Sequence, residues 1–286
     1  MRAVSDPLET LLQSALGAMS DTAAAPTEIT AARLLGAVGR SVFRLLGHAG
    51  RLAIFMGATV TRPIHRRFGG WELVSQLSFV GAGSIAVVTL SAVFTGLVLV
   101  LQGYGALVRF GSENLVGSLV ALSLTRELAP VLTALMVTAR AGSAMTATIG
   151  NMAVTEQIDA LDALAVDPLK YLVLPRLLAT AVALPLLAAL FSVAGIAAGY
   201  LLGVNVLGLD GLAFMSHVRS SVEWKDVWVG LCKALVFGVV IAAIATFRGV
   251  QTRGGARGVG HATSRTVVET AVLILCGDYV MTALLF

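Results

Sequence analysis

Charge is what this sequence has least of. Only 13% of its 286 residues are Asp, Glu, Lys or Arg, whereas soluble domains carry about 25%. Hydrophobic residues make up 57% and there are 30 glycines, so too few polar side chains remain to cover a water-soluble core. The composition therefore predicts an integral membrane protein. It excludes a disordered chain, which would need high charge and low hydrophobicity.

Motifs of several enzyme and metal-binding classes are also missing. No Gly-Lys dipeptide occurs, so there is no P-loop lysine for ATP. The four histidines have no metal-ligand spacing, and no Gly-x-Ser-x-Gly motif marks a hydrolase nucleophile. Cys232 and Cys276 lie in apolar runs, which argues against a disulfide framework or a zinc site. We expect a non-catalytic chain without a metal or a nucleic-acid partner.

The N-terminal part divides into a tail and a helix. Residues 1–30 are small and polar and predict a flexible tail without a signal peptide. Residues 31–57 predict a helix with its basic side chains on one narrow stripe, lying at the membrane interface with the arginines near lipid phosphates. The alternative is a first span with arginines facing a bundle interior, which four charges would make costly. These interfacial anchors are Arg33, Arg40, Arg44 and Arg51.

Long stretches with little charge predict an all-α bundle of five membrane spans over about residues 80–286, since a span needs about 20 apolar residues. We expect a loop over 248–265. If the N-terminus is cytoplasmic, fourteen of the 20 Lys and Arg residues lie inside and three outside, as the positive-inside rule favours. The predicted spans lie near 80–103 and within 114–155, 177–209, 227–247 and 266–286.

Arg126 and Glu127 are embedded in the apolar second span. Charges at membrane depth are costly and usually face a cavity or a partner. Neighbouring helical residues point about 100° apart, so one could line a cavity while the other binds another helix. Pro130 has no N–H and therefore frees a backbone carbonyl near Arg126. Two interpretations stay open, a functional pair in a cavity and a structural ion pair that locks the bundle.

Three glycines recur at every fourth residue of the third span, at Gly195, Gly199 and Gly203. This spacing lets helices approach closely. Packing within the chain is the favoured interpretation, and a contact between two copies is the alternative.

The acidic stretch 155–168 predicts a short helix between spans two and three. Thr155 is placed to cap it, Glu156 and Asp159 favour its positive N-terminal end, and Pro168 is expected to end it. Such a helix is either a docking element for a soluble partner or a plain surface helix. Its apolar face holds Ile158, Leu161 and Ala165, and another face holds Asp159 and Asp162.

Four segments, at 122–131, 139–151, 154–177 and 278–286, resemble the MlaE (YrbE-like) family. These proteins are permease subunits of ABC lipid transporters that work with MCE proteins. The similarity runs from about residue 33 to the end, so residues 31–286 are expected to form a single permease domain.

The resemblance implies a phospholipid transporter and its partners. We expect a homodimer in the bacterial inner membrane, with the N-terminus cytoplasmic and the C-terminus periplasmic. A cytoplasmic ABC ATPase would bind ATP and Mg²⁺, so this chain is expected to hold no cofactor. A periplasmic MCE-domain protein, expected as a hexamer, would receive or deliver lipid, and a small STAS-domain protein is a further candidate partner.

The resemblance also implies two sites. The ATPase would dock on the acidic helix, where Gln157 stands in place of a Glu found in many members. In the lipid cavity, Phe110 replaces a Tyr found in some members. The alternative function is a secondary transporter, driven by an ion gradient, that uses Arg126 and Glu127. The docking residues are Glu156, Gln157, Asp159, Ala160 and Asp162, and the cavity residues are Leu99, Phe110, Arg126, Glu127 and Leu128.

Overall fold

The structure is a computed structural model that describes residues 47, 50–59 and 70–285. Every regular element in that part of the chain is helical, and five helical stretches there are long and apolar enough to cross a membrane. The expected all-α class and the five spans are therefore confirmed. The five stretches are Gly70–Phe110, Glu113–Val154, Leu169–Asn205, Trp224–Val250 and Gly255–Leu285.

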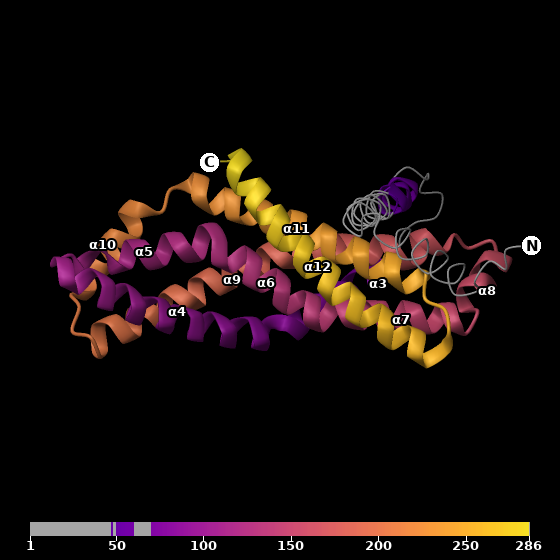
Figure 1. The fold of residues 1–286 in the computed structure, drawn as a ribbon, viewed down its shortest axis with the longest axis horizontal. Coiled ribbons are helices and arrows are strands. Elements are labelled where there is room, and N and C mark those ends of the chain that lie inside the picture. Colours follow the sequence, from indigo (N-terminus) through magenta and orange to yellow (C-terminus); the bar gives the residue numbers. More distant parts are fainter. Residues whose placement is uncertain (1–46, 48–49, 60–69, 286) are drawn as a thin grey trace, which may run out of the picture. The chain divides into compact units, whose positions relative to one another are not determined.

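Several spans are built from more than one helix (Figure 1). A short break after Val80 divides the first span, and two π-helical turns, Leu124–Leu128 and Thr138–Gly142, divide the second. The helices are α3 (Gly70–Val80), α4 (Ile85–Leu107), α5 (Val116–Ser123), α6 (Ala129–Val137), α7 (Ser143–Val154), α8 (Gln157–Ala163), α9 (Leu174–Asn205), α10 (Gly211–Ser221), α11 (Trp224–Val250) and α12 (Gly255–Leu285).

Two expectations about the connections were wrong or incomplete. The predicted loop over 248–265 is much shorter, because α12 begins at Gly255 and carries Arg257 and Arg265. Gly254 and Gly255 both adopt positive φ angles, which glycine tolerates, and so they complete the turn in few residues. Helix α10 was not predicted, and it occupies most of the polar stretch before α11.

The interfacial helix is described only in part. Residues 50–59 are helical and Arg51 is exposed, whereas Arg33, Arg40 and Arg44 lie outside the described residues, as does the predicted tail. The interfacial position of this helix stays a prediction.

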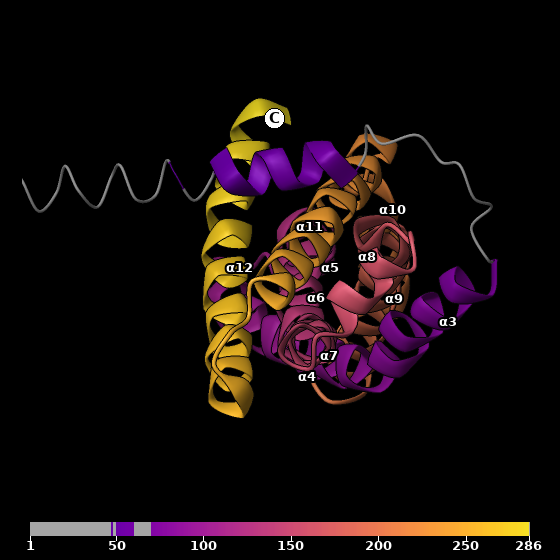
Figure 2. The ribbon, with the colours of Figure 1, turned by 90° about the vertical axis from the view of Figure 1, so that its right-hand side faces the viewer.

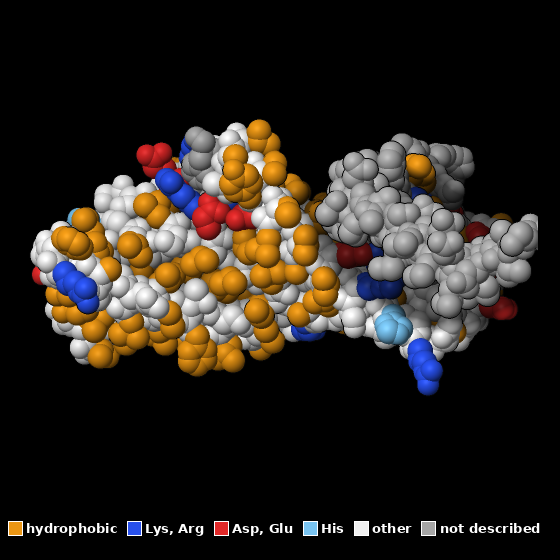
Figure 3. Space-filling view, in the orientation of Figure 1, with side chains coloured by type: hydrophobic (Ala, Val, Ile, Leu, Met, Phe, Trp, Pro, Cys, Tyr) orange, Lys and Arg blue, Asp and Glu red, His pale blue; other side chains and the backbone are white. Residues whose placement is uncertain are grey.

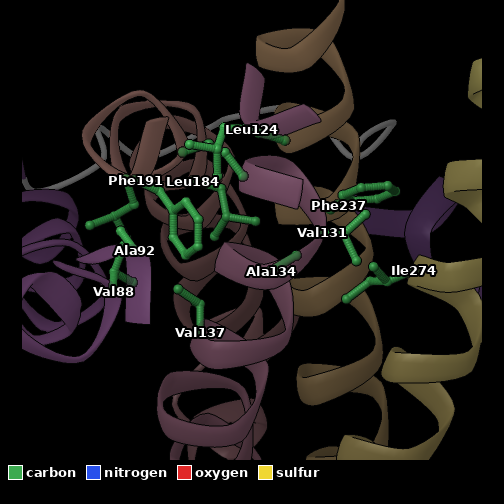
Figure 4. Close-up of a cluster of buried hydrophobic side chains, with 14 of the residues drawn as sticks. Val88, Ala92, Leu124, Val131, Ala134, Val137, Leu184, Phe191, Phe237 and Ile274 are labelled. Atoms are coloured by element: carbon green, nitrogen blue, oxygen red, sulfur yellow. The ribbon is translucent and has the colours of Figure 1, made fainter. Parts of the chain in front are cut away.

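The core of residues 70–285 gathers side chains from four spans around the second one (Figure 4). Phe191 of α9 lies near Val88 and Ala92 of α4, and Leu124 of the second span lies above them. Because lipid tails are as apolar as these side chains, close packing rather than exclusion from water holds such spans together. In Figure 2, α12 lies at one edge of this bundle and α3 at the opposite edge.

The glycine stripe packs within the chain, as the favoured interpretation predicted. Gly195 lies against Leu124 and α4, and a Cβ atom on Gly199 would come within 2.8 Å of Val100. A Cβ atom on Gly96 of α4 would overlap the carbonyl of Gly195. The stripe therefore lets α4 and α9 touch backbone to backbone.

In Figure 3, hydrophobic side chains are spread over the described surface of the spans, and acidic and basic side chains appear at only a few places, one of them in the upper middle of the view. Exposed Phe, Leu and Val side chains on several spans account for this surface. Such a surface suits lipid rather than water.

Candidate functional site

The π-helical turn Leu124–Leu128 places two charged neighbours toward α11. Arg126 forms an ion pair with Asp226, with 2.8 Å between Nη2 and Oδ1. Glu127 forms one with Lys233, with 2.6 Å between Oε2 and Nζ. The extra residue of a π turn shifts the direction of the side chains that follow, and such turns are frequent at functional sites. Both charges therefore have partners on the same helix.

Lys233 is the centre of this network and is fully buried. Its ammonium group lies 3.0 Å from Asp278 and donates hydrogen bonds to Glu127 and to the hydroxyl of Thr282, the latter at 2.7 Å. Thr282 donates to the Asp278 carbonyl at 2.8 Å. A buried charge is tolerated only when it is paired and hydrogen-bonded, and these contacts from the second and fifth spans meet that requirement.

Pro130 explains a further contact of Lys233. In a regular helix the N–H of residue 130 would donate to the carbonyl of Arg126, but proline has no N–H. The Lys233 ammonium donates to this carbonyl at 3.3 Å instead. The carbonyl that the sequence predicted to be free is therefore bound by a side chain of α11.

Burial differs between the members of the network. The Arg126 and Glu127 side chains are 37% and 38% exposed, whereas Asp226 is 2% exposed. The α11 partners thus hold the pair from inside, and the outer parts of Arg126 and Glu127 remain open at the surface of the chain. The structure shows the ion pairs that the structural interpretation requires. Arg126 and Glu127 are also partly exposed, so a ligand can reach both side chains.

The other predicted cavity residues lie on neighbouring elements. Leu99 of α4 and Leu128 are half-buried and pack against the core. Phe110 follows the end of α4 and is 80% exposed. The structure therefore brings Leu128 together with the charged pair, while Leu99 and Phe110 stand on the first span.

The predicted docking helix forms as α8 and projects from the bundle beside α7 (Figure 1). Its predicted residues Glu156, Gln157, Asp159, Ala160 and Asp162 are all exposed. Thr155 does not cap it, because its hydroxyl donates to the Asn151 carbonyl, and Glu156 takes the N-cap position with a φ of 59°. Nor does Pro168 end it, since α8 ends at Ala163 and Pro168 precedes the next helical turn.

Arg140 is a third charged residue of the second span. Its side chain contacts residues at the break between α3 and α4 in the first span. Its Nε donates to Ser84 at 3.0 Å, its Nη2 donates to the Phe79 carbonyl, and its guanidinium lies 5.1 Å from the Phe79 ring centroid. A Cβ atom on Gly83 would collide with this guanidinium. Arg140 therefore joins the second span to the junction of α3 and α4.

The sequence did not assign roles to Asp226, Lys233, Asp278 or Thr282. A single Lys or Asp inside an otherwise apolar span was the available signal, because such residues seldom lack a partner. The partner itself could not be read from the sequence, since the contacting residues are far apart in the chain.

These features define a multi-pass membrane protein with paired charges inside its candidate spans. No group of three or more His, Cys, Asp or Glu suited to a metal occurs in the described ranges.

Comparison with known proteins identifies the family. The family described as Permease MlaE matches residues 73–284. The chain is 42% identical over 257 residues to the intermembrane phospholipid transport system permease protein MlaE of Haemophilus influenzae, covering 88% of this chain and 97% of that one. A probable ABC transporter permease protein of Synechocystis is 39% identical, covering 80% of this chain and 88% of that one. The chain belongs to the MlaE permease family.

A plant protein shows how far the similarity extends. The chloroplastic protein TRIGALACTOSYLDIACYLGLYCEROL 1 of Arabidopsis thaliana is 34% identical over 233 residues, covering 82% of this chain and 67% of that one. Membership of this family makes the chain a membrane permease component and not an ATPase.

Proposed function

We propose that this chain is the permease subunit of an ATP-driven phospholipid transporter that moves lipid between the inner membrane and a periplasmic MCE protein. The observation that carries the proposal is the charge network at membrane depth, with Arg126 and Glu127 partly exposed in a five-span chain of the MlaE family. The name of the Haemophilus influenzae relative supports phospholipid as the substrate.

ATP hydrolysis is assigned to a separate subunit. The sequence has no P-loop lysine, and α8 offers an exposed acidic surface between the second and third spans. We assign Glu156, Gln157, Asp159, Ala160 and Asp162 to the contact with the ATPase. ATP and Mg²⁺ would bind to that partner, and this chain would hold no cofactor.

Movement of α8 can reach the charged pair through the second span. From Glu127 to Val154 this span is continuously helical, a length of roughly 40 Å at 1.5 Å per residue. A displacement of α8 by the ATPase would therefore tilt a stiff element whose other half carries Arg126 and Glu127. In a homodimer this tilt would change the width of a cavity between the two copies, lined by Leu99, Phe110 and Leu128 as well.

Arg126 is our candidate for the lipid phosphate. A guanidinium presents N–H donors that suit phosphate oxygens, and the Arg126 side chain is 37% exposed beside Asp226. The orientation we propose has α8 and the N-terminus in the cytoplasm and the C-terminus in the periplasm, following the distribution of Lys and Arg. An MCE-domain hexamer would then meet the α10 end, and a STAS-domain protein would join the ATPase.

The test uses the chain with and without its ATPase. Proteoliposomes that contain the whole complex should extract fluorescent phospholipid only when ATP is present, and the chain alone should not hydrolyse ATP. ATP turnover by the chain alone would contradict the division of labour.

The second candidate is a transporter driven by an ion gradient, because two carboxylates, those of Glu127 and Asp278, contact one buried lysine between three spans. Lipid movement that follows a proton or sodium gradient and ignores ATP would favour this candidate and overturn the proposal.

A further inference from the structure

A groove lies beside the second span, and neither Arg126 nor Glu127 is among its lining residues. One hollow of about 410 Å³ lies between the second span, α9, α10 and α11, with Pro130, Ser192 and Leu231 in its wall. A second hollow of about 440 Å³ continues it between α9 and α10. Val193 and Ile196 line both hollows. Each volume lies within the roughly 300–1,000 Å³ typical of small-molecule sites.

Small residues create the groove. Ala188, Ala189 and Ser192 leave space along α9, and Gly230 lets α11 approach the second span so closely that a Cβ atom would overlap the Thr125 carbonyl. Ala189 is exposed, so nothing within the described chain fills the space above it. The hollow therefore results from small side chains on α9 beside a close contact between α11 and the second span, and not from loose packing of the helices.

The wall of the groove offers almost no polar group to a ligand. The hydroxyl of Ser192 donates to the Ala188 carbonyl at 3.1 Å, and that of Thr125 donates to the Ala121 carbonyl at 2.7 Å. Both hydroxyls are therefore bound within their own helices. Apart from Tyr200 and Met215 in the second hollow and a single charged side chain, the remaining lining side chains are hydrocarbon, and they suit an acyl chain.

That charged side chain is Arg219, near the C-terminal end of α10. It is exposed, and no carboxylate of the described chain forms an ion pair with it. The nearby acids are occupied: Asp226 binds Arg126, Glu223 caps α11, and Asp210 caps α10. An apolar groove thus ends at a cation that has no ion-pair partner among the described residues.

The level of Arg219 in the membrane follows from its surroundings. Trp224 and Trp228 begin α11 just after α10 and are 81% and 64% exposed. Exposed tryptophans at the end of a span mark the headgroup level of a bilayer. Figure 1 shows α10 at the opposite end of the bundle from α8. Arg219 therefore lies where the phosphates of the leaflet on the α10 side are found.

We propose that this groove binds one phospholipid of the surrounding bilayer, with an acyl chain along α9 and its phosphate on Arg219. The site is separate from the Arg126 and Glu127 pair, because neither residue lines the groove. Val193 of α9 and Met215 of α10 line the groove and are exposed, so lipid can reach it from the surface of the described chain. The proposal does not depend on ATP-driven transport.

The test is photolabelling of the full-length chain, with its partner subunits, in nanodiscs without nucleotide. The probe is phosphatidylglycerol with a diazirine on one acyl chain, and the comparison probe is diacylglycerol with the same diazirine. Labelled peptides are mapped by mass spectrometry. We expect the phosphatidylglycerol label to concentrate on α9 between Ala188 and Leu201.

Two substitutions should reduce the label. Ala189→Trp fills the groove and should remove most of it. Arg219→Gln should lower phosphatidylglycerol labelling about fivefold, the effect of about 1 kcal/mol for one basic residue near a phospholipid surface. Arg219→Lys should restore it. The diacylglycerol probe has no phosphate, so its labelling should not respond to Arg219→Gln.

Two controls match these variants. Val182→Trp places the same Trp side chain at an exposed position of α9 outside the groove, and Arg109→Gln removes another exposed cation outside it. Both should leave labelling unchanged, and equal melting temperatures of the two Trp variants would exclude misfolding. Uniform labelling along the exposed side of α9 would overturn the proposal. A groove covered by a second copy or a partner helix would also overturn it. Failure of ATP-driven transport alone would contradict the proposed function and leave the groove intact.

Discussion

Lys233 of α11 donates a hydrogen bond of 2.6 Å to Glu127 of the second span, and both residues lie within candidate membrane spans. The same ammonium group lies 3.0 Å from Asp278 of α12. One lysine therefore holds three spans together. Its removal would leave two carboxylates facing each other in a medium that stabilises neither charge.

We predict that Lys233→Met destabilises the chain by about 3–5 kcal/mol, the cost of breaking a buried ion pair by removing one partner. Thermal unfolding in detergent, followed by size-exclusion chromatography, measures the effect. The triple variant Lys233→Met, Glu127→Gln, Asp278→Asn should recover much of the loss, because no uncompensated charge remains. An unchanged melting temperature for Lys233→Met would show that the network contributes nothing to stability.

Arg126 and its partner should have separable effects. Arg126→Ala removes the proposed phosphate contact, and we expect co-purified phospholipid to fall about tenfold, since a hydrogen bond to a charged group contributes about 1.5–3 kcal/mol. Asp226→Asn keeps the guanidinium and should lower stability more than lipid binding. Quantitative lipid mass spectrometry of both variants distinguishes the roles. Equal lipid loss in both would indicate that Arg126 acts only through the ion pair.

The acidic face of α8 should control binding of the ATPase. Asp159→Lys with Asp162→Lys reverses two exposed charges, and we expect affinity for the ATPase to fall at least about tenfold, or about 1.4 kcal/mol. Gln157→Ala removes no charge and is the control. Co-purification and lipid-stimulated ATPase activity are the measurements. Normal assembly of the double-lysine variant would show that the ATPase docks elsewhere.

Two glycines of α4 provide a test variant and a matched control for the close contact between α4 and α9. Gly96→Ala places a methyl group on the Gly195 carbonyl and should destabilise the chain by about 1–3 kcal/mol. Gly105→Ala adds the same group to open space and should be neutral or stabilising by up to about 1 kcal/mol, because alanine favours helix. Melting temperatures of the two variants test this, and equal values would contradict the packing argument.

The spans could be predicted because their signal is local. Long stretches with little charge located all five, and the spacing of Gly195, Gly199 and Gly203 indicated a close helix contact that the structure places against α4. The acidic helix was found for the same reason. Its N-terminal end was predicted wrongly because Glu156, and not Thr155, takes the N-cap position in a left-handed conformation. No residue pattern in this stretch predicts that conformation.

The charge network could be predicted only in part. The sequence singled out Arg126 and Glu127 because charged residues in an apolar span are rare, but their partners follow a hundred or more residues later. Such pairing depends on how the spans pack, and helical periodicity within one span carries no information about it. The π-helical turns and α10 were missed for a related reason, since tertiary contacts stabilise them more than local propensity does.

The contact between Lys233 and the carbonyl left open by Pro130 also bears on the order in which this chain can be assembled. The second span enters the membrane with a backbone acceptor and two charged side chains that only later spans can satisfy. Until α11 arrives, this part of the span favours protein or water over lipid, and Asp278 arrives later still, with α12. A nascent chain stopped before Trp224 therefore lacks these partners of its second span, and the complete set of contacts to Lys233 forms only when synthesis is almost complete.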